Sequence, residues 1–356
     1  MTVEVEPLLL HPGSSTRDAV ETIDRNRLGI ALLVDDARRL VATITDGDIR
    51  RAMLAGIDLD SPVETLVDRQ REEPYPRPLT APAGSTASDL LALMTLYTLR
   101  HIPIVDEERR VIDLALLHDL VEDTQLPVRA VVMAGGFGTR LGELTEHTPK
   151  PMLPVGDRPL LERIVDQLRE AGIQRVNMTT HFKSDVISDH FGDGRDFGVE
   201  INYVNEHTPL GTAGAISLLE ASTEPLLVMN GDILTRVDLR AMVHYHQEHL
   251  ADMTVAIWPY ELRVPHGVIE TADGWVTSIT EKPVIRSFVN AGIYLLNPHV
   301  AQLVPHGERF DMPQLIERLI EGGHKVASFP LREYWLDIGQ ADDYQRAIFD
   351  VHESES

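Results

Sequence analysis

The chain has 356 residues, 43% hydrophobic and 25% charged, a composition typical of folded globular proteins and long enough for two domains of unequal size. It contains no cysteine, which excludes disulfide scaffolds, thiolate metal sites and cysteine nucleophiles. No apolar run approaches the roughly 20 residues that span a bilayer. The first residues lack the basic segment that begins a secretory signal, so we expect a cytoplasmic protein.

The formal net charge is −24, and so acidic a chain should repel nucleic acid and anionic membranes at long range. We therefore expect neither as a partner. Any phosphate must be bound by a local group of donors, against the field of the whole molecule. Only four of the 32 basic residues are lysines: Lys150, Lys183, Lys282 and Lys325. Lysine is a compact point charge and arginine a planar fork, so the two are not interchangeable at a phosphate site.

Residues 1–123 contain an internal repeat with an offset of 71 residues, which aligns Asp18 with Asp89 and Asp48 with Asp119 without a gap. Each copy predicts a helix, an apolar strand, an Asp-rich turn, a second strand and a second helix. The predicted elements are 16–26, 29–34, 40–45 and 46–55 in the first copy, and 86–99, 101–105, 111–116 and 117–123 in the second. A copy of about 60 residues cannot bury both faces of its sheet, so the two should pack together.

This repeat resembles a pair of CBS domains (a Bateman module). Its most specific segment is 44–48, Ile-Thr-Asp-Gly-Asp. In that family a hydroxyl and a carboxylate at this spacing hold the ribose of an adenosine nucleotide, which implies that Thr45 and Asp48 bind AMP or ATP. The second copy has Leu116 in place of the hydroxyl, so at most one such site is intact. The alternative is a module used only for assembly, in which Asp48 caps the next helix. CBS pairs usually associate, so we expect a homo-oligomer.

A short linker, 124–128, leads to a segment with a different pattern, 129–356. Strands alternate here with helices, which predicts an α/β fold with a Rossmann-like, doubly wound, mixed but mostly parallel sheet. The predicted strands are 130–133, 175–180, 200–204 and 226–229, and the predicted helices are 160–171, 183–190 and 211–221. Such sheets bind ligands at the carboxyl ends of their strands.

The first of these strands leads into a glycine-rich turn, 134–141, with the sequence Ala-Gly-Gly-Phe-Gly-Thr-Arg-Leu. Glycines let the backbone approach a phosphate and point N–H groups at it, and Arg140 adds charge-assisted donors. The turn is neither a Walker A loop nor a dinucleotide fingerprint, because the residue spacing of both fails. In the segment 148–155, three prolines fix the backbone around Lys150. A glycine turn alone is also consistent with a tight strand exit.

The two segments together resemble the signature of the sugar-1-phosphate nucleotidyltransferases, and the resemblance runs from about 129 to 350. It implies an enzyme that uses Mg²⁺, a nucleoside triphosphate and a sugar 1-phosphate. The residues that it assigns to the nucleotide are Ala134, Gly135, Gly136, Gly138, Thr139, Arg140, Glu206 and Gly211. It assigns Asp232 and Asp337 to the metal, whose preferred ligands are hard carboxylate oxygens.

The same resemblance implies a sugar-phosphate site. Its residues are Gly267, Glu281, Lys282 and Asn290. Lys282 would meet the phosphate of the sugar 1-phosphate, and Glu281 would accept hydrogen bonds from sugar hydroxyls. A solvated ion pair is the simpler interpretation of these two residues, but the scarcity of lysine in this chain argues against it.

Residue 206 bears on the nucleobase. Relatives that use uridine or thymidine nucleotides commonly have Gln where this chain has Glu206. Guanine presents two adjacent donors, and a carboxylate, which only accepts, matches both. The run 209–214, Pro-Leu-Gly-Thr-Ala-Gly, also resembles the mannose-1-phosphate guanylyltransferase branch, so we expect GTP. The alternative is that Glu206 faces solvent and the backbone reads the base.

The sugar is predicted from the domain combination alone. A CBS pair joined to this branch resembles enzymes that make a GDP-linked amino sugar for nonulosonic (legionaminic) acids, which suggests glucosamine 1-phosphate. Mannose 1-phosphate and heptose 1-phosphate remain open, as do thymidylyl, uridylyl or cytidylyl transfer and a non-sugar alcohol phosphate as acceptor. The non-enzyme alternative is a nucleotide-sensing regulator, and the intact Arg140, Lys150 and Asp232 argue against it.

The expected reaction is in-line attack of the sugar-phosphate oxygen on the α-phosphorus of the triphosphate, with release of pyrophosphate. The nucleophile is already an anion, so catalysis reduces to positioning and charge neutralisation, and Arg140, Lys150 and Asp232 are the predicted catalytic residues. Fifteen histidines also invite a metal-site interpretation, especially His244, His246 and His249. On a helix 244 and 246 lie on different faces, so we interpret the three as surface polar positions.

Overall fold

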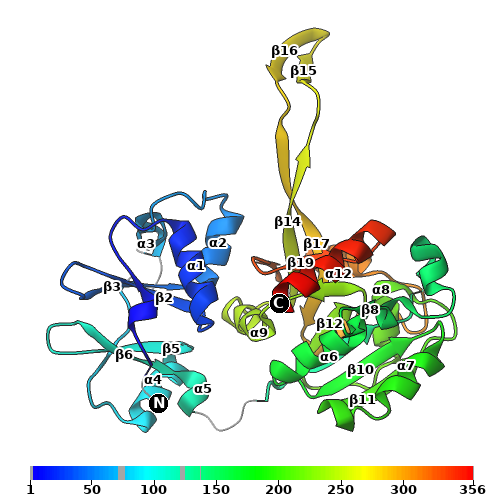
Figure 1. The fold of residues 1–356 in the computed structure, drawn as a ribbon, viewed down its shortest axis with the longest axis horizontal. Helices are drawn as coiled ribbons and strands as arrows, with labels where there is room; N and C mark the ends of the chain where they lie inside the picture. The colour runs from blue at the N-terminus through cyan, green and yellow to red at the C-terminus, as the bar shows by residue number, and fades with distance from the viewer. Residues whose placement is uncertain (1–2, 71–76, 121–124, 137, 356) are drawn as a thin grey trace. The chain divides into compact units, whose positions relative to one another are not determined.

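The structure, a computed structural model, describes residues 3–70, 77–120, 125–136 and 138–355. The chain divides into two units, 1–124 and 125–356 (Figure 1). Within the described ranges, no helix has both the length and the apolar character needed to cross a membrane.

Two copies of one motif build the first unit. The elements of the first copy are α1 (Thr16–Asn26), β2 (Ile30–Val34), β3 (Leu40–Thr45) and α2 (Asp46–Leu54), and those of the second are α4 (Ala87–Tyr97), β5 (His101–Val105), β6 (Val111–Leu116) and α5 (Leu117–Leu120). These bounds agree with the predicted ones to within two residues, except that 121–123 lie outside the described residues. In each copy a short strand, β1 (Leu9–Leu10) or β4 (Ala81–Pro82), completes a three-stranded sheet, and α3 (Glu64–Gln70) follows α2.

The repeat extends to the helix caps. Ser15 precedes α1 and Thr86 precedes α4, and each hydroxyl accepts a hydrogen bond from the backbone N–H of an aspartate three residues on. That aspartate, Asp18 or Asp89, in turn accepts from the backbone N–H of the Ser or Thr, which is a capping box. The same local signal therefore begins the first helix of both copies.

The two copies meet at matching turns. Asp35 Oδ2 accepts a hydrogen bond from Arg39 Nε at 2.8 Å, and Asp106 Oδ2 accepts from Arg110 Nε at 2.7 Å. Arg39 and Arg110 form an antiparallel bridge between the two turns. Buried side chains from both copies form one cluster: Leu8, Ile30, Leu32, Leu40, Leu114 and Leu116. The copies therefore share part of their core.

A mixed seven-stranded sheet is the centre of the second unit (Figure 1). Its strands in spatial order are β11 (Glu200–Asn205), β10 (Arg175–Thr180), β7 (Arg129–Met133), β12 (Leu226–Asn230), β17 (Val284–Leu296), β14 (Met253–Arg263) and β18 (Val326–Pro330). The first four run parallel, β17 is antiparallel to both of its neighbours, and β14 pairs in parallel with β18. This arrangement confirms the predicted fold class.

Successive residues of the sheet pack into clusters on its two faces, as the alternation of a strand requires. Val132 belongs to the cluster that includes the buried face of α6 (Leu160–Glu170), and Val131 to the cluster that includes α11 (Met312–Glu321). The other helices of this unit are α7 (Ser184–Phe191), α8 (Gly211–Gly214), α9 (Leu239–Glu248), α10 (Pro298–Ala301) and α12 (Ala341–Glu355). Both faces of the sheet are covered, so the ends of the strands are where a ligand can reach it.

The helix predicted over 211–221 is shorter than expected. It consists of α8 and a 3₁₀ turn, Ala215–Leu218. The backbone N–H groups of Ala213 and Gly214 both donate to Phe310 O, at 2.9 and 2.8 Å. The chain leaves the helical conformation at Leu219, whose φ of −75° and ψ of 150° are extended.

A long two-stranded ribbon, residues 258–289, extends from the sheet, and we call it the arm (Figure 1). It consists of the outer halves of β14 and β17 and of the hairpin β15 (Val268–Ala272) and β16 (Trp275–Thr280). The inner end of β17 is buried in the sheet, whereas every residue of β15 and β16 is exposed.

Candidate functional site

The candidate site lies at the carboxyl ends of β7 and β12. Asp232 follows β12 and precedes β13 (Ile233–Thr235), which pairs with β19 (Trp335–Asp337) so that Ile233 is opposite Asp337. The backbone N–H of Ile338 donates to Asp232 O at 3.0 Å. This small ladder brings the two predicted metal ligands together from distant parts of the sequence.

Lys150 reaches the same place from its proline-rich segment. Its Nζ donates to Asp232 Oδ2 at 2.6 Å, and its side chain is only 12% exposed. Partial removal from water raises the pKa of Asp337, and the nearby charge of Asp232 raises it further. Lys150 and Arg140 act in the opposite direction. The structure therefore collects two mutually repelling carboxylates and the two predicted cationic residues at one point.

The residues at this point fit a divalent metal ion. The repulsion that raises the pKa of Asp337 is what a bound cation would relieve. Asn230 Oδ1, a buried atom of the same segment, has no hydrogen-bond partner among the described residues. Two carboxylates and an amide oxygen are hard donors of the kind that Mg²⁺ takes.

The glycine-rich turn packs directly against the Lys150 segment. Gly138 has a φ of +65°, and a Cβ there would lie 2.8 Å from Thr145 Cγ2 and 3.1 Å from Lys150 Cβ. Apart from its chain neighbours, no atom of the described residues lies within 4 Å of the corresponding position at Gly136. The turn is anchored by the backbone N–H of Ala134, which donates to Thr179 O at 2.9 Å. Thr139 and Arg140 are exposed, and Phe137 lies outside the described residues.

Glu206 is half-buried beside this turn. Its Oε2 accepts a hydrogen bond from the backbone N–H of Leu210 at 2.9 Å, and its Oε1 lies 3.1 Å from the position of a Cβ on Gly135. The fold therefore brings Glu206 and the glycine turn together, as the nucleotide prediction requires. Gly211 has a φ of +81°, and a Cβ there would lie 2.5 Å from Asp311 Oδ1, so its close neighbour is the start of α11.

A cavity of about 390 Å³ adjoins the carboxylates. Its wall includes Asn230, Asn290, Tyr294, Asp311, Trp335 and Asp337. Amide and carboxylate groups together with an indole suit a polyhydroxylated ring, which offers both hydrogen-bonding groups and an apolar face. Of the four predicted sugar-phosphate residues, Asn290 is the one that lines this cavity.

The other three predicted sugar-phosphate residues lie on the arm. Gly267 and Glu281 are neighbours, since a Cβ on Gly267 would lie 3.0 Å from Glu281 Oε2, and the exposed Lys282 follows with a φ of +45°. Six extended residues, 284–289, separate them from Asn290, a distance of roughly 20 Å at about 3.3 Å per residue. The structure therefore does not bring Glu281 and Lys282 to the cavity of their own chain.

Thr45 and Asp48 form a capping box at the start of α2. The backbone N–H and the hydroxyl of Thr45 both donate to Asp48 Oδ2 at 2.7 Å, and Arg51 Nη2 lies 2.6 Å from Asp48 Oδ1. Both oxygens of this carboxylate, which is 7% exposed, are thus engaged within the protein. A ribose would have to share or replace these bonds.

The interpretation of His246 as a surface residue is wrong. Its side chain is 4% exposed, Nδ1 lies 2.8 Å from Thr254 Oγ1, and Nε2 lies 3.3 Å from Asn297 Oδ1. Burial lowers its pKa, which favours the neutral ring. The signal was present in the sequence, because Met242 and Tyr245 mark the apolar face of α9 on which His246 also lies.

The second unit is thus an α/β protein with a candidate ligand site at the carboxyl ends of its strands. Residues 129–354 match the family model of the nucleotidyl transferases, and residues 3–55 and 73–123 match that of the CBS domain. The chain belongs to the nucleotidyl transferase family and is an enzyme of that class with CBS domains at its N-terminal side, as its motifs predict.

Individual relatives agree with this assignment. The chain is 34% identical over 225 residues to a D-glycero-alpha-D-manno-heptose 1-phosphate guanylyltransferase of Aneurinibacillus thermoaerophilus, which covers 62% of this chain and 96% of the relative. It is 34% identical over 235 residues to a mannose-1-phosphate guanylyltransferase of Mycobacterium tuberculosis, covering 63% of this chain and 64% of that one.

Solved structures show the same fold. A proposed glucose-1-phosphate thymidylyltransferase of Bacillus anthracis, in complex with sucrose, aligns with a TM-score of 0.53 at 25% identity, over 64% of this chain and 96% of that one. HddC of Yersinia pseudotuberculosis aligns with a TM-score of 0.50 at 26% identity, over 63% of this chain and 99% of that one. Both alignments leave about a third of this chain uncovered.

Proposed function

We propose that this enzyme transfers GMP from GTP to a sugar 1-phosphate and releases pyrophosphate. The observation that carries the proposal is the convergence of Lys150, Asp232 and Asp337 beside the glycine-rich turn. We assign residues 1–123 to a CBS module, 124–128 to a linker and 129–356 to the catalytic domain.

The residues at the site have the following proposed roles. The amides of the glycine-rich turn and Arg140 bind the triphosphate, and Lys150 neutralises charge at the reacting phosphate. Asp232 and Asp337 hold a divalent ion, with Mg²⁺ as the proposed metal, and that ion supplies further charge neutralisation to the phosphates. The sugar-phosphate oxygen attacks the α-phosphorus in line and the pyrophosphate leaves. No proton has to be removed, so rate depends on positioning and electrostatics.

Glu206 supports GTP as the donor. It lies beside the turn that would hold the phosphates, and a carboxylate can accept from both donors of the guanine edge. Its Oε2 already accepts one bond from Leu210, but a carboxylate oxygen has a second lone pair. The printed names of the heptose and mannose relatives also specify guanylyl transfer.

For the acceptor we propose glucosamine 1-phosphate. Besides the domain combination, the cavity wall contains the Asp311 carboxylate, which could accept from the ammonium group of an amino sugar. Mannose 1-phosphate and heptose 1-phosphate are the alternatives, and the named activities of the relatives favour them. The sugar-binding roles of Glu281 and Lys282 belong to this proposal as well.

The deciding experiment is a matrix of nucleoside triphosphates against sugar 1-phosphates with Mg²⁺, followed by pyrophosphate release. The donors are GTP, UTP, dTTP and CTP, and the acceptors are the 1-phosphates of glucosamine, mannose, heptose and glucose. We expect turnover with GTP and the highest kcat/KM with glucosamine 1-phosphate. A preference for another donor would reject the role of Glu206, and no turnover with any pair would favour the nucleotide-sensing regulator.

We further propose that the first unit binds AMP or ATP at Thr45 and Asp48 and that the protein is a homo-oligomer. A bound nucleotide should raise the melting temperature, because it stabilises only the folded state. The Asp48→Asn variant keeps a cap acceptor but loses the charge, and it should lose the shift. Asp119→Asn, the matched change in the second copy, should keep it. No shift in the wild type would leave an assembly role for the module.

A further inference from the structure

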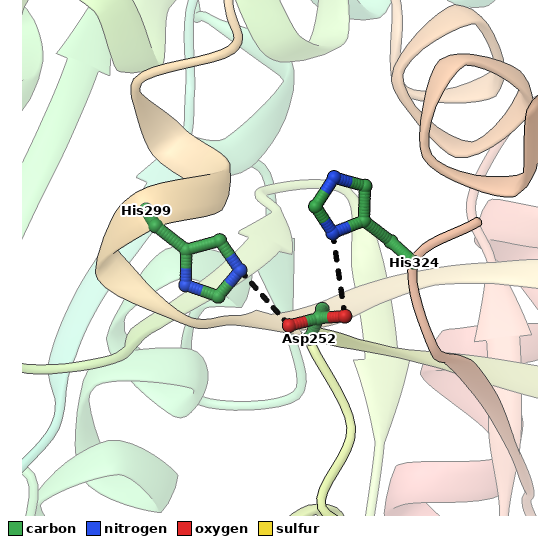
Figure 2. A group of neighbouring side chains, drawn as sticks. All are labelled: Asp252, His299 and His324. Carbon is green, nitrogen blue, oxygen red and sulfur yellow. Dashed lines mark ion pairs between the residues drawn. The ribbon is translucent and has the colours of Figure 1, made fainter. Parts of the chain in front are cut away.

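Three side chains outside the candidate site converge on one point of the second unit (Figure 2). Asp252 immediately precedes β14, His299 lies on α10, and His324 lies just before β18. This point is at the opposite end of the sheet from the cavity, because Met253 pairs with Leu296, whereas the cavity begins six residues earlier at Asn290. The cluster therefore shares no residue with the proposed catalytic metal site.

The geometry of the cluster is that of a metal-binding group. Asp252 Oδ1 lies 2.9 Å from His299 Nε2, and Asp252 Oδ2 lies 3.4 Å from His324 Nδ1. The three ligand atoms all lie within 4.8 Å of one another, and Figure 2 shows both rings directing a nitrogen at the carboxylate. A single metal ion could replace the hydrogens that bridge each imidazole nitrogen and the carboxylate.

The backbone holds the three segments in place before any ion arrives. Asp252 donates its N–H to Lys325 O at 2.8 Å and accepts through its own carbonyl from Asn297 N–H at 2.9 Å. Its Oδ2 also accepts from Lys325 N–H at 2.9 Å, which fixes the orientation of the carboxylate. A ligand that is oriented by such outer contacts binds a metal more tightly than a free one.

We propose that Asp252, His299 and His324 bind a first-row divalent ion such as Zn²⁺. Two imidazoles and one carboxylate suit this class of ion, whereas Mg²⁺ prefers oxygen ligands alone. The three side chains are between 25% and 50% exposed, which leaves room for water as a further ligand. A bound ion would tie α10 and the edge strand β18 to the start of β14.

Co²⁺ is the probe, because nitrogen ligation in four or five coordination gives it a visible absorption much stronger than that of a six-coordinate oxygen site. The full-length protein should show this band, and His299→Ala and His324→Ala should each remove it. His11→Ala, an exposed histidine of the first unit, is the matched control and should keep it. A wild type without the band, or a band that survives both substitutions in the cluster, overturns the proposal.

A second inference rests on a different observation, the exposed apolar side chains of the arm. Residues directly opposite one another in an antiparallel pair share a face. Leu262 is opposite Ile285, and Tyr260 is on the same face two residues away. The other face contains the ion pair between Glu261 and Arg286, 2.9 Å apart. Val284 and Phe288, which are also exposed, lie on this second face, since each is two residues from Arg286. Exposed apolar side chains therefore lie on both faces of the ribbon, and the other described residues of its unit do not cover them.

The exposed apolar area of the arm is as large as a protein interface. Its apolar side chains that are between 37% and 78% exposed are Tyr260, Leu262, Val268, Ile269, Trp275, Val276, Ile279, Val284, Ile285 and Phe288. At roughly 150 Å² for a whole large side chain, they offer on the order of 800 Å² over the two faces of the ribbon together, which is what one partner contributes to an interface of standard size. An isolated two-stranded ribbon is marginally stable in water, so a covering surface is required.

We infer that the partner is a second copy of this chain and that the arm brings Lys282 to the cavity of that copy. This inference rests on the proposed function, which gives Lys282 a role in binding sugar phosphate. Within one copy, Lys282 lies roughly 20 Å along the ribbon from Asn290. An arm that lies against a neighbour buries these apolar side chains and completes the neighbour's site in one arrangement.

The test combines two inactive variants in one oligomer. Asp232→Asn has a defective site and an intact arm, and Lys282→Ala has the reverse. The two variants are co-expressed with different tags. In a mixed dimer, the intact arm of the Asp232→Asn copy can complete the intact site of the Lys282→Ala copy. We expect each variant alone to lose activity and the unfractionated mixture to regain roughly a quarter of the wild-type rate, since half of the dimers are mixed and one site in each is complete.

Purified mixed dimers that stay inactive, or Lys282→Ala protein with wild-type activity, would overturn the inference while leaving the transferase proposal intact. The covering of the arm is tested separately by molecular mass in solution. The double variant Leu262→Glu, Ile285→Glu should lose the arm interface and sediment with a lower mass than the wild type. Glu261→Lys with Arg286→Glu, which reverses the ion pair on the opposite face, is the control and should keep the mass.

Discussion

Lys150 and Asp232 neutralise one another at the centre of the candidate site, with 2.6 Å between Nζ and Oδ2. Because Lys150 is proposed to neutralise charge on the phosphates and Asp232 to hold the divalent ion that does so, losing either should cost about 100- to 1000-fold in kcat. We expect this loss for Lys150→Ala and for Asp232→Asn, measured by pyrophosphate release. Lys325→Ala, which removes an exposed lysine outside the cavity wall, should keep the wild-type rate. A variant at Lys150 or Asp232 with normal turnover would contradict the assignment.

Asp337 should make the protein less stable as the pH rises. Partial removal from water and the charge of Asp232 raise its pKa in the folded state above the ordinary value of 3.8. Ionisation therefore favours the unfolded chain, and stability is lost as the pH rises from 3.8 through the folded-state value. In EDTA, Asp337→Asn should melt at a higher temperature than the wild type at neutral pH, and the gap should narrow towards pH 4. A lower melting temperature for the variant at neutral pH contradicts this argument.

At the scale of the element, two glycines of the phosphate turn should respond differently to alanine. Gly138→Ala places a Cβ 2.8 Å from Thr145 Cγ2 at a φ of +65°, a conformation that costs an L-residue roughly 1–2 kcal/mol, so its melting temperature should fall. The Cβ of Gly136→Ala meets no described atom within 4 Å beyond the chain neighbours, so this variant should fold normally. If phosphates lie on this turn, the added methyl group should still raise KM for the triphosphate by about tenfold. Unchanged KM in Gly136→Ala would place the triphosphate elsewhere.

The sequence predicts those elements best whose pattern is local. The internal repeat and the apolar face of α6 predict the helices and strands of the two copies and of the first part of the second unit. The elements after β12 are not among the predicted ones. The arm is absent from the predicted elements, although Asp273 and Gly274 between two alternating runs are a hairpin signal. Both residues have positive φ, +50° and +84°, as that turn requires.

The sequence also predicts some residues of the candidate sites and misses others. Asp232 and Asp337 are predicted because each follows or ends a strand within a recognisable motif. The sequence does not predict the cluster of Asp252, His299 and His324. Its three ligands come from separate segments, so they leave no short-range pattern in the sequence. The separation of Lys282 from the cavity also escapes the sequence, since it depends on the direction in which β14 and β17 leave the sheet.

The whole molecule carries a net charge of −24, and this charge should oppose folding through self-repulsion. Salt shortens the range of that repulsion, from a Debye length of about 30 Å at 0.01 M to about 10 Å at 0.1 M. We therefore expect the melting temperature to rise as NaCl is increased across this range, measured by calorimetry without divalent ions. KCl should have the same effect, because screening depends on ionic strength. A melting temperature that is constant or falls would show that local ion pairs outweigh the net charge.

The bridge between Arg39 and Arg110 places two guanidinium-bearing residues side by side, and each forms ion pairs within its own turn, Arg39 with Asp35 and Arg110 with Asp106 and Glu108. The pKa of Asp35 is lowered, most of all by the hydrogen bond from the backbone N–H of Arg39. Desolvation raises the pKa of Asp106, but the hydrogen bonds from Arg110 outweigh this effect, so that pKa is lowered as well. The stability that these pairs contribute is present above the ordinary carboxyl pKa and disappears as the pH falls through the lowered values. Acid should therefore loosen the joint between the repeats before either repeat melts. Faster hydrogen exchange at the Leu40 amide, which donates across this joint to Arg109 O, would report that early opening.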